Sequence, residues 1–237
     1  MWIEPATFQP QTGEIVGVRL RVGQDLLGDP LPRDPALVNQ FIFEDASGRK
    51  AVVGRDGADP AGFLRVAAPG LVVVGYRSNT SSVELAPEKF IQYLKDEGLD
   101  GITPKLGHNR ELFARCAKSL LLSGPATPAQ MDRTLGFPLE LVAGRNPYLL
   151  HSGEELPVRL TYENKPLVGA LVVAINRRNP SEKTAVRSDH EGRAKFQLRS
   201  GGMWLIKAVH MIPAPAGINA EWMSYWASLT FDTGKAQ

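Results

Sequence analysis

Apolar and polar residues alternate along several stretches of the chain, with the period of two expected for half-buried β-strands. The clearest case is the segment Ala194–Leu198, in which Phe196 would face a core and Lys195 would face water. The turn Asp189–Gly192 precedes this segment. Asp suits a turn because it bonds its own backbone, and Gly suits one because it adopts positive φ readily. This region predicts a small antiparallel β-sandwich.

Turn-forming residues interrupt the apolar stretches throughout, and the chain contains 23 Gly and 18 Pro. Short strands separated by such turn signals are typical of β-sandwiches. In the first half we expect strands at Ile15–Val22, Gln40–Glu44, Lys50–Val53, Gly62–Val66, Gly70–Tyr76 and Ser82–Leu85. In the second half we expect them at Leu139–Val142, Glu155–Tyr162, Ala170–Asn176, Ala185–Ser188, Ala194–Leu198, Met203–Val209 and Met223–Phe231.

The two halves of the chain resemble each other. Thr12–Leu20 and Ser152–Leu160 both place a Gly-Glu turn before a strand that carries Val-Arg-Leu. We therefore predict an all-β chain built from two tandem immunoglobulin-like or transthyretin-like β-sandwiches with a short helical insertion. The expected boundaries are 1–123 for the first sandwich, with the helical insertion near 87–118, then 124–137 for a linker and 138–237 for the second sandwich.

The helical insertion is predicted from Pro87–Gly98, which has Pro at its first turn and Gly at its end. Phe90 and Leu94 supply an apolar face at helical spacing. The next stretch, Asn109–Lys118, is ambiguous, because its apolar spacing fits a helix but it continues into Leu120–Leu122, which is typical of a strand.

Composition excludes several classes of function. A net charge of +2 with scattered basic residues does not favour nucleic-acid binding. A single cysteine, Cys116, excludes an intrachain disulfide and a cysteine-rich metal site. The longest apolar stretches are too short to span a bilayer. The chain has no Gly-x-Ser-x-Gly element and no phosphate-binding glycine loop, so we expect that it is not an enzyme.

A series of short segments carries a family resemblance. They are Trp2–Pro5, Arg19–Gln24, Arg115–Lys118, Pro138–Val142, Asn146–Tyr148, Lys165–Leu167, Gly169–Ala170, Lys207–Met211 and Trp222–Phe231. Together they resemble a secreted or periplasmic bacterial family of unknown function that is associated with nickel and cobalt uptake. The resemblance covers essentially the whole chain. Its members commonly carry a histidine just before the aromatic–Trp pair, whereas Met1 stands beside Trp2 here.

The resemblance implies a periplasmic or secreted location, a nickel or cobalt ion as ligand and a membrane transporter component as partner. It also implies a second domain similar to transthyretin or to carboxypeptidase-regulatory modules. Nickel and cobalt favour imidazole ligands. The candidate metal ligands are therefore His210, near the end of a strand and on the face of Ala208, together with His151 and His108. No two histidines have a ligand spacing, so the fold would have to assemble the site, and structural histidines are the alternative.

Aromatic residues near the end of the chain provide an alternative binding site. In a strand, Trp222 and Trp226 would share one face and Tyr225 would lie on the other. These residues could stack on a glycan or protein partner, although burial in a core alone explains them and is the stronger interpretation. The sequence thus predicts a periplasmic metal-handling or transport-accessory protein, with a non-enzymatic interaction module as the alternative.

Further residues are expected to have structural roles. Arg115 can form a bidentate ion pair with a carboxylate and so fix the angle between the domains. Asn146 precedes a proline and favours a turn. Lys118 is assigned to the same scaffold.

Overall fold

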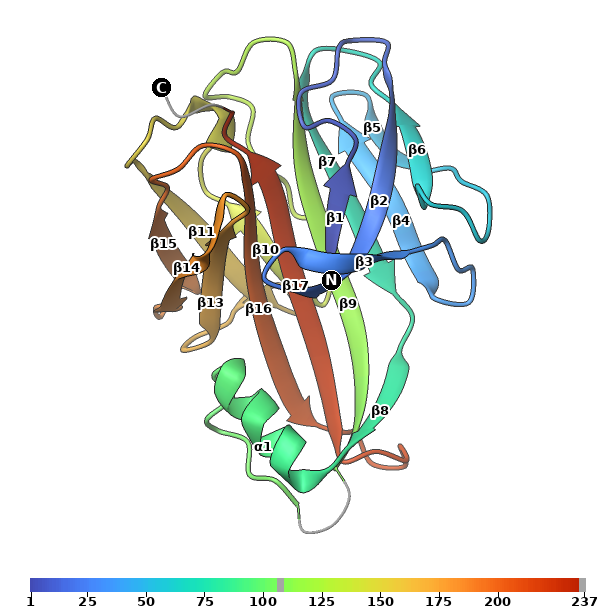
Figure 1. Cartoon of the computed structure of the whole chain (residues 1–237), viewed down its shortest axis with the longest axis vertical. Helices are drawn as coiled ribbons and strands as arrows, with labels where there is room; N and C mark the ends of the chain where they lie inside the picture. Colours follow the sequence, from blue (N-terminus) through green and yellow to red (C-terminus); the bar gives the residue numbers. More distant parts are fainter. Residues whose placement is uncertain (106–108, 235–237) are drawn as a thin grey trace.

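The computed structural model describes residues 1–105 and 109–234, which form strands and one α-helix (Figure 1). The first half contains β1 (Trp2–Pro5), β2 (Ile15–Gln24), β3 (Leu27–Leu31), β4 (Val38–Asp45), β5 (Gly48–Ala51), β6 (Gly62–Arg65), β7 (Gly70–Ser78), β8 (Ser81–Leu85), α1 (Pro87–Asp96) and β9 (Asn109–Ser123). The second half contains β10 (Leu139–Ala143), the 3-10 turn η1 (Pro147–Leu149), β11 (Glu155–Tyr162), β12 (Lys165–Pro166), β13 (Leu171–Asn176), β14 (Asn179–Arg187), β15 (Arg193–Gln197), β16 (Met203–Pro213) and β17 (Trp222–Asp232). The predicted all-β class with a short helix is confirmed.

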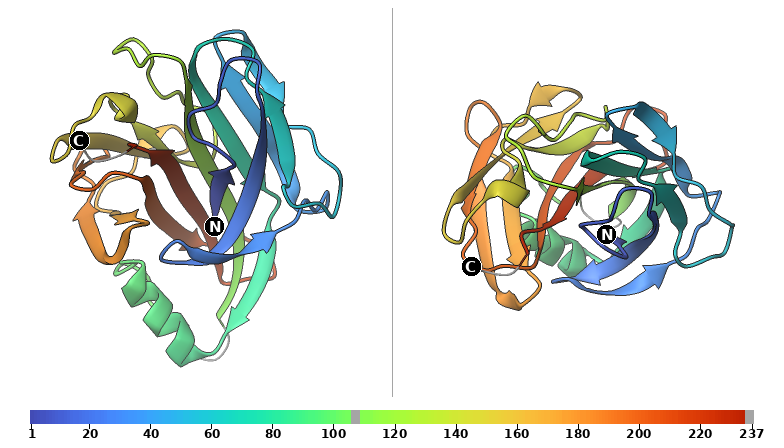
Figure 2. Two further views of the ribbon diagram at one scale, coloured as in Figure 1. Left: turned by 45° about the horizontal axis from the view of Figure 1, so that its top comes forward. Right: turned by 90° about the horizontal axis from the view of Figure 1, so that it is seen from above.

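One large sheet runs through both halves of the chain. Within the described residues it has the strand order β14-β13-β16-β17-β9-β7-β4-β5, and β8 also pairs with β9. At its centre β17 and β9 run parallel, from Trp222 opposite Glu111 to Thr230 opposite Ser119. A strand from the end of the chain is therefore hydrogen-bonded to a strand of the first half, and the two halves lie side by side (Figures 1 and 2).

Two smaller sheets pack on opposite faces of the large one. The sheet of β1, β2, β3 and β6 covers the first half, and the sheet of β10, β11, β12 and β15 covers the second. Strand β7 contributes to both cores: Val72 and Val74 pack under the first sheet, whereas Leu71 and Val73 pack under the second. Because successive strand residues face opposite sides, the two cores lie on opposite faces. This explains why β7 is apolar without interruption, like a strand buried on both faces.

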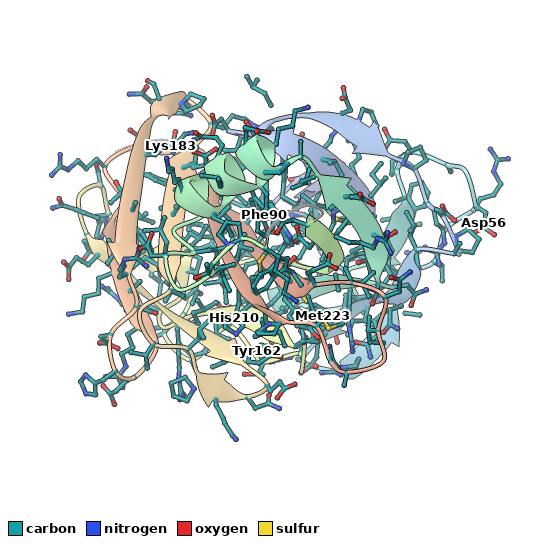
Figure 3. All side chains as sticks on the ribbon, turned by 90° about the horizontal axis from the view of Figure 1, so that it is seen from below. Asp56, Phe90, Tyr162, Lys183, His210 and Met223 are labelled. Atoms are coloured by element: carbon teal, nitrogen blue, oxygen red, sulfur yellow. The ribbon has the colours of Figure 1, made fainter. Side chains whose placement is uncertain are left out.

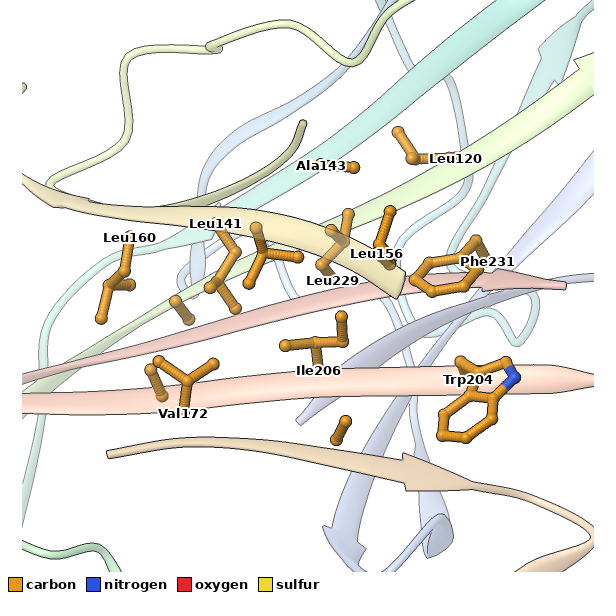
Figure 4. Close-up of a cluster of buried hydrophobic side chains, with 14 of the residues drawn as sticks. Leu120, Leu141, Ala143, Leu156, Leu160, Val172, Trp204, Ile206, Leu229 and Phe231 are labelled. Carbon is orange, nitrogen blue, oxygen red and sulfur yellow. The ribbon is translucent and has the colours of Figure 1, made fainter. Parts of the chain in front are cut away.

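The second core is made by side chains of the two facing sheets. Leu141 and Leu160, from β10 and β11, face Ile206 and Leu229, from β16 and β17 (Figure 4). All four are at most 1% exposed. Burying a leucine or isoleucine side chain contributes roughly 1.5–3 kcal/mol, so this layer is a principal source of stability.

The region predicted as a helical insertion near 87–118 is helical only over α1. Strand β9 begins within the same region, so the ambiguous segment Asn109–Lys118 is a strand and not a helix. β9 has hydrogen-bonded strands on both sides, β17 on one and β7 or β8 on the other, and these ladders outweigh its helix-like spacing. Among the described residues, no helix combines the length and apolar character needed to cross a bilayer. The boundaries at 123 and 138 stay a prediction.

Candidate functional site

A cleft lies on the outer face of β16 and β17, the face turned away from the second core. Trp2 and Leu26 cover one end of this face, where they pack with Leu205. Helix α1 covers the other end through Phe90. Between these covers lies a cleft of about 670 Å³. This size is within the usual range for small-molecule sites.

The large sheet, helix α1, the first two residues and the β2–β3 turn all line the cleft. The floor comes from β13, β14, β16 and β17, and one wall comes from α1. The opposite wall comes from Met1, Trp2 and the turn that joins β2 to β3. In the view of Figure 1 this is the region between α1 and the β2–β3 hairpin, in front of β16 and β17. Residues distant in sequence therefore meet here, as is typical of binding sites.

Charged side chains connect the walls of the cleft to its floor. Lys207 on β16 donates to Glu97 at the end of α1, with 2.6 Å between Nζ and Oε1. Lys183 on β14 lies 2.5 Å from the Asp25 carboxylate on the β2–β3 turn. The Lys207–Glu97 pair is mostly shielded, with side chains 29% and 12% exposed, so water screens it less than a surface pair.

An aromatic pair forms part of the α1 side of the cleft. Tyr93 stacks on Trp226 with ring centroids 5.5 Å apart and planes 7° apart. Behind this pair, the Tyr93 hydroxyl donates to Oε1 of the buried Glu111 at 3.0 Å, and the Ser224 hydroxyl also donates to it. Burial raises the pKa of Glu111 and of Tyr93. A carboxyl group with a raised pKa thus lies beneath the aromatic wall.

The predicted aromatic binding residues occupy different environments. Trp226 lines the cleft. Trp222 is 6% exposed, stacks on Phe90 and donates to Asn109, so it belongs to the core behind α1. Tyr225 points to the other face of the large sheet, as the strand alternation predicts.

His210 lies on that other face with Tyr225, its neighbour across the strands. The His210 ring contacts Tyr162 with centroids 4.5 Å apart, and Figure 3 shows both on the opposite side of the sheet from Phe90. Burial lowers the pKa of His210. The pKa of Tyr162 rises to about 12 through burial and the neighbouring Tyr225 and Glu163. The Tyr225 hydroxyl also lies 3.4 Å from the Met223 sulfur.

The predicted metal ligands are not brought together within the described part of the chain. His151 is exposed in the turn before β11, whereas the His210 ring contacts Tyr162 at the opposite end of that strand. His108 lies outside the described residues. In the described ranges, no group of three or more His, Cys, Asp or Glu side chains could hold a metal ion.

The residues assigned to the scaffold have well-defined surroundings. Lys118 is buried against two carboxylates. Asn146 caps η1, accepting from the Tyr148 backbone at 3.0 Å. Arg115 was expected to pair with a carboxylate, but no ion pair of Arg115 is found among the described residues; its guanidinium lies 4.8 Å from the centroid of the Phe113 ring.

Sequence reasoning did not assign Lys207, Glu97 or Tyr93 to a site. One signal was available, because Lys207 is a charged residue inside the apolar stretch Met203–Ile212. Charged side chains in buried strands need a partner, which points to a polar feature on that face. The partner, Glu97, follows a helix whose position relative to β16 the sequence does not reveal.

Comparisons with known proteins give a family. No curated protein matches the sequence. A solved structure, the D0-D1 domain of Intimin, is 10% identical, with 97% of this chain and 96% of that chain covered and a TM-score of 0.22, which is too low to support an argument about fold or function. Residues 1–212 match the family described as "Domain of unknown function (DUF4198)". The chain therefore belongs to this family.

Proposed function

We propose that this chain is a non-enzymatic binding protein that holds a small organic ligand in the cleft between α1 and the large sheet. The observation that carries the proposal is the cleft of about 670 Å³, whose apolar floor is edged by ion-paired side chains. Apolar surface with a few placed polar groups is the usual composition of ligand pockets.

The cleft offers a distinct contact for each part of such a ligand. Val173 and Leu205 on the floor provide apolar contact. Trp226, stacked on Tyr93, presents an aromatic side chain that can pack against a flat group. Lys207 can orient a polar group, because an ammonium has three donors and Glu97 takes one of them.

The setting that we propose is the periplasm, where the protein would pass its ligand to a membrane transporter. The resemblance to proteins associated with nickel and cobalt uptake supports this setting. A second candidate function is nickel or cobalt handling through His210. It is favoured by the lowered pKa of His210, since a neutral imidazole is the form that binds metal.

The cleft can be tested with phenylnaphthylamine, an uncharged aromatic probe that fluoresces on leaving water. Gln92→Trp and Gln24→Trp place a bulky side chain in the cleft from opposite walls, at exposed positions that tolerate it. Ile91→Trp is the matched control, because Ile91 is 41% exposed on the same helix but is not among the residues lining the cleft.

We expect the wild type and Ile91→Trp to bind the probe with equal affinity. Both cleft variants should bind it about tenfold more weakly or worse, because the introduced Trp removes contacts between the probe and the cleft. Equal binding by all four proteins would place the probe elsewhere and overturn the proposal. Absence of saturable binding to the wild type would do the same.

A further inference from the structure

Three ionisable side chains lie together beside the second core, on the opposite face of the large sheet from the cleft. Lys118 projects from β9 to the face that also carries Cys116 and Leu120. Its Nζ lies 3.0 Å from Oδ1 of Asp132 and 3.1 Å from Oε1 of Glu140. All three side chains are at most 1% exposed. An amine and two carboxyl groups are therefore held in contact, away from water.

The segment that precedes β10 closes this site. Gly75 on β7 pairs with Lys118 on β9. A Cβ at Gly75 would lie 2.3 Å from Leu135 and 2.8 Å from Phe137, so these two side chains occupy the space that the glycine leaves free. Both are buried members of the second core. Lys118 also donates to the backbone oxygen of Arg133 at 2.7 Å, which fixes the position of its amine.

The site contains one more acid than base. Within the described ranges, Lys118 is the only cation paired with Asp132 or with Glu140. If all three groups were ionised, the site would carry an excess negative charge without contact to water. Such a charge is costly in a buried site, so the site favours one additional proton. Burial raises the pKa of Asp132 in agreement with this.

The two carboxyl groups differ in their backbone donors. The Glu140 carboxylate accepts from three consecutive backbone amides, those of Leu135, Gly136 and Phe137. The Asp132 carboxyl accepts from two, those of Arg133 and Ala143. Because each such hydrogen bond stabilises the charged form, Glu140 is the better anion. We therefore assign the additional proton to Asp132 and the negative charge to Glu140.

We propose that Lys118 and Asp132 condense to an amide, which links β9 covalently to the segment before β10. The Lys118 ammonium first gives a proton to Glu140, and an amine out of water is then a nucleophile. Its Nζ attacks Cγ of the protonated Asp132. The bond from Cγ to the hydroxyl breaks, and the hydroxyl leaves as water with a second proton from Nζ. Glu140 ends as a neutral acid, and no oxidant or other reactant is needed.

The surroundings favour this reaction in three ways. The backbone amides of Arg133 and Ala143 lie 2.7 and 2.8 Å from the Asp132 oxygens, where they can stabilise the negative charge that develops there during attack. The fold holds the amine against the carboxyl group, which replaces a chance encounter. The product also exchanges a buried ion pair for neutral groups, and this removes the cost of keeping two charges away from water.

Mass spectrometry of the purified full chain tests the inference. We expect the wild-type mass to lie one water molecule below the mass of the sequence. Trypsin does not cleave after a lysine whose amine is acylated, so the peptide Cys116–Arg133 should appear whole and one water lighter. Fragmentation of this peptide then locates the link between Lys118 and Asp132.

Variants test the role of each group. Glu140→Gln removes the base but keeps an oxygen that can accept from the backbone amides, and it should retain the full mass. Asp132→Ala should also retain the full mass. Glu154→Gln is the control, since Glu154 is an exposed acid that should not affect the loss of water. Cooperative urea unfolding identifies the variants that have folded.

The opposite results would overturn the inference. A wild-type mass equal to that of the sequence, with cleavage after Lys118, would do so without any variant. Loss of water at another place would do so as well, for example at Asp56 or Asp100, which precede Gly and can cyclise to a succinimide. A link that persists in folded Glu140→Gln would overturn the role of Glu140 as the base. The inference is independent of the proposed cleft, whose probe binding is measured separately.

Discussion

The ammonium of Lys118 lies 3.0 Å from the carboxylate of Asp132, and both side chains are at most 1% exposed. A second carboxylate, that of Glu140, lies 3.1 Å from the same ammonium. Backbone amides complete the site: Ala143 donates to Asp132 at 2.8 Å, and Leu135 donates to Glu140 at 2.6 Å. The segment between the two predicted sandwiches is therefore fixed to β9 by a buried ionic network.

Replacing Lys118 by Met keeps much of its volume but leaves two buried carboxylates without a cation. We expect the free energy of unfolding to fall by about 3–5 kcal/mol, as when one partner of a buried ion pair is removed. Urea unfolding measures the change. Arg145→Met is the control, since its pair with Glu154 is exposed and contributes less than about 1 kcal/mol. A similar, small loss in both variants would contradict the prediction.

Glu111→Gln is expected to change how stability depends on pH. Burial raises the pKa of Glu111 in the folded protein above its ordinary 4.5. A carboxyl group whose pKa is raised on folding makes the protein less stable as the pH rises from its unfolded value through its folded one. Gln cannot ionise, and its Oε1 can still accept from Tyr93 and Ser224.

The variant should therefore match the wild type near about pH 4 and be more stable near about pH 8, by about 1.4 kcal/mol for each unit of raised pKa. Thermal and urea unfolding across this range measure the difference, with the exposed Glu191→Gln as control. A variant less stable than the wild type at the higher pH would show that Glu111 is needed as an anion.

Trp222 and Ile91 lie on elements in contact but differ in burial. Trp222 packs on Phe90 and its ring N–H donates to Asn109, so Trp222→Ala leaves a cavity beneath α1 and removes one of the hydrogen bonds that the side-chain oxygen of Asn109 accepts. We expect a loss of about 3–5 kcal/mol in urea unfolding. Ile91→Ala, on the exposed side of the helix, should change stability by less than about 0.5 kcal/mol. Equal losses would mean that α1 does not dock through Trp222.

The strands that the sequence reveals are those with alternating or continuously apolar positions, such as β11, whose bounds match the prediction at Glu155–Tyr162. The strand β3 was not predicted, because Gly28-Asp29-Pro30 is typical of a turn. It forms as a partner of β2, and as an edge strand it tolerates proline. Its formation depends on pairing rather than on local preference.

The parallel pairing of β17 with β9 could also not be predicted from the sequence. Each strand has an ordinary apolar pattern, and nothing local in the chain indicates that Trp226 lies beside Arg115. The candidate site depends on this pairing. The alternation did predict that Trp226 and Tyr225 face opposite sides of the sheet. In the structure Trp226 lines the cleft, and Tyr225 lies on the face that carries His210.

Titration of nickel and cobalt into the wild type and His210→Ala separates the two candidate functions. Metal handling through His210 requires a saturable site that the alanine variant loses. If the cleft is the functional site, we expect both proteins to bind these ions alike and no tighter than about 100 µM. Gln92→Trp should leave metal binding unchanged while it blocks the cleft. Tight binding lost in His210→Ala would reverse this expectation and place the function on the Tyr162 face of the sheet.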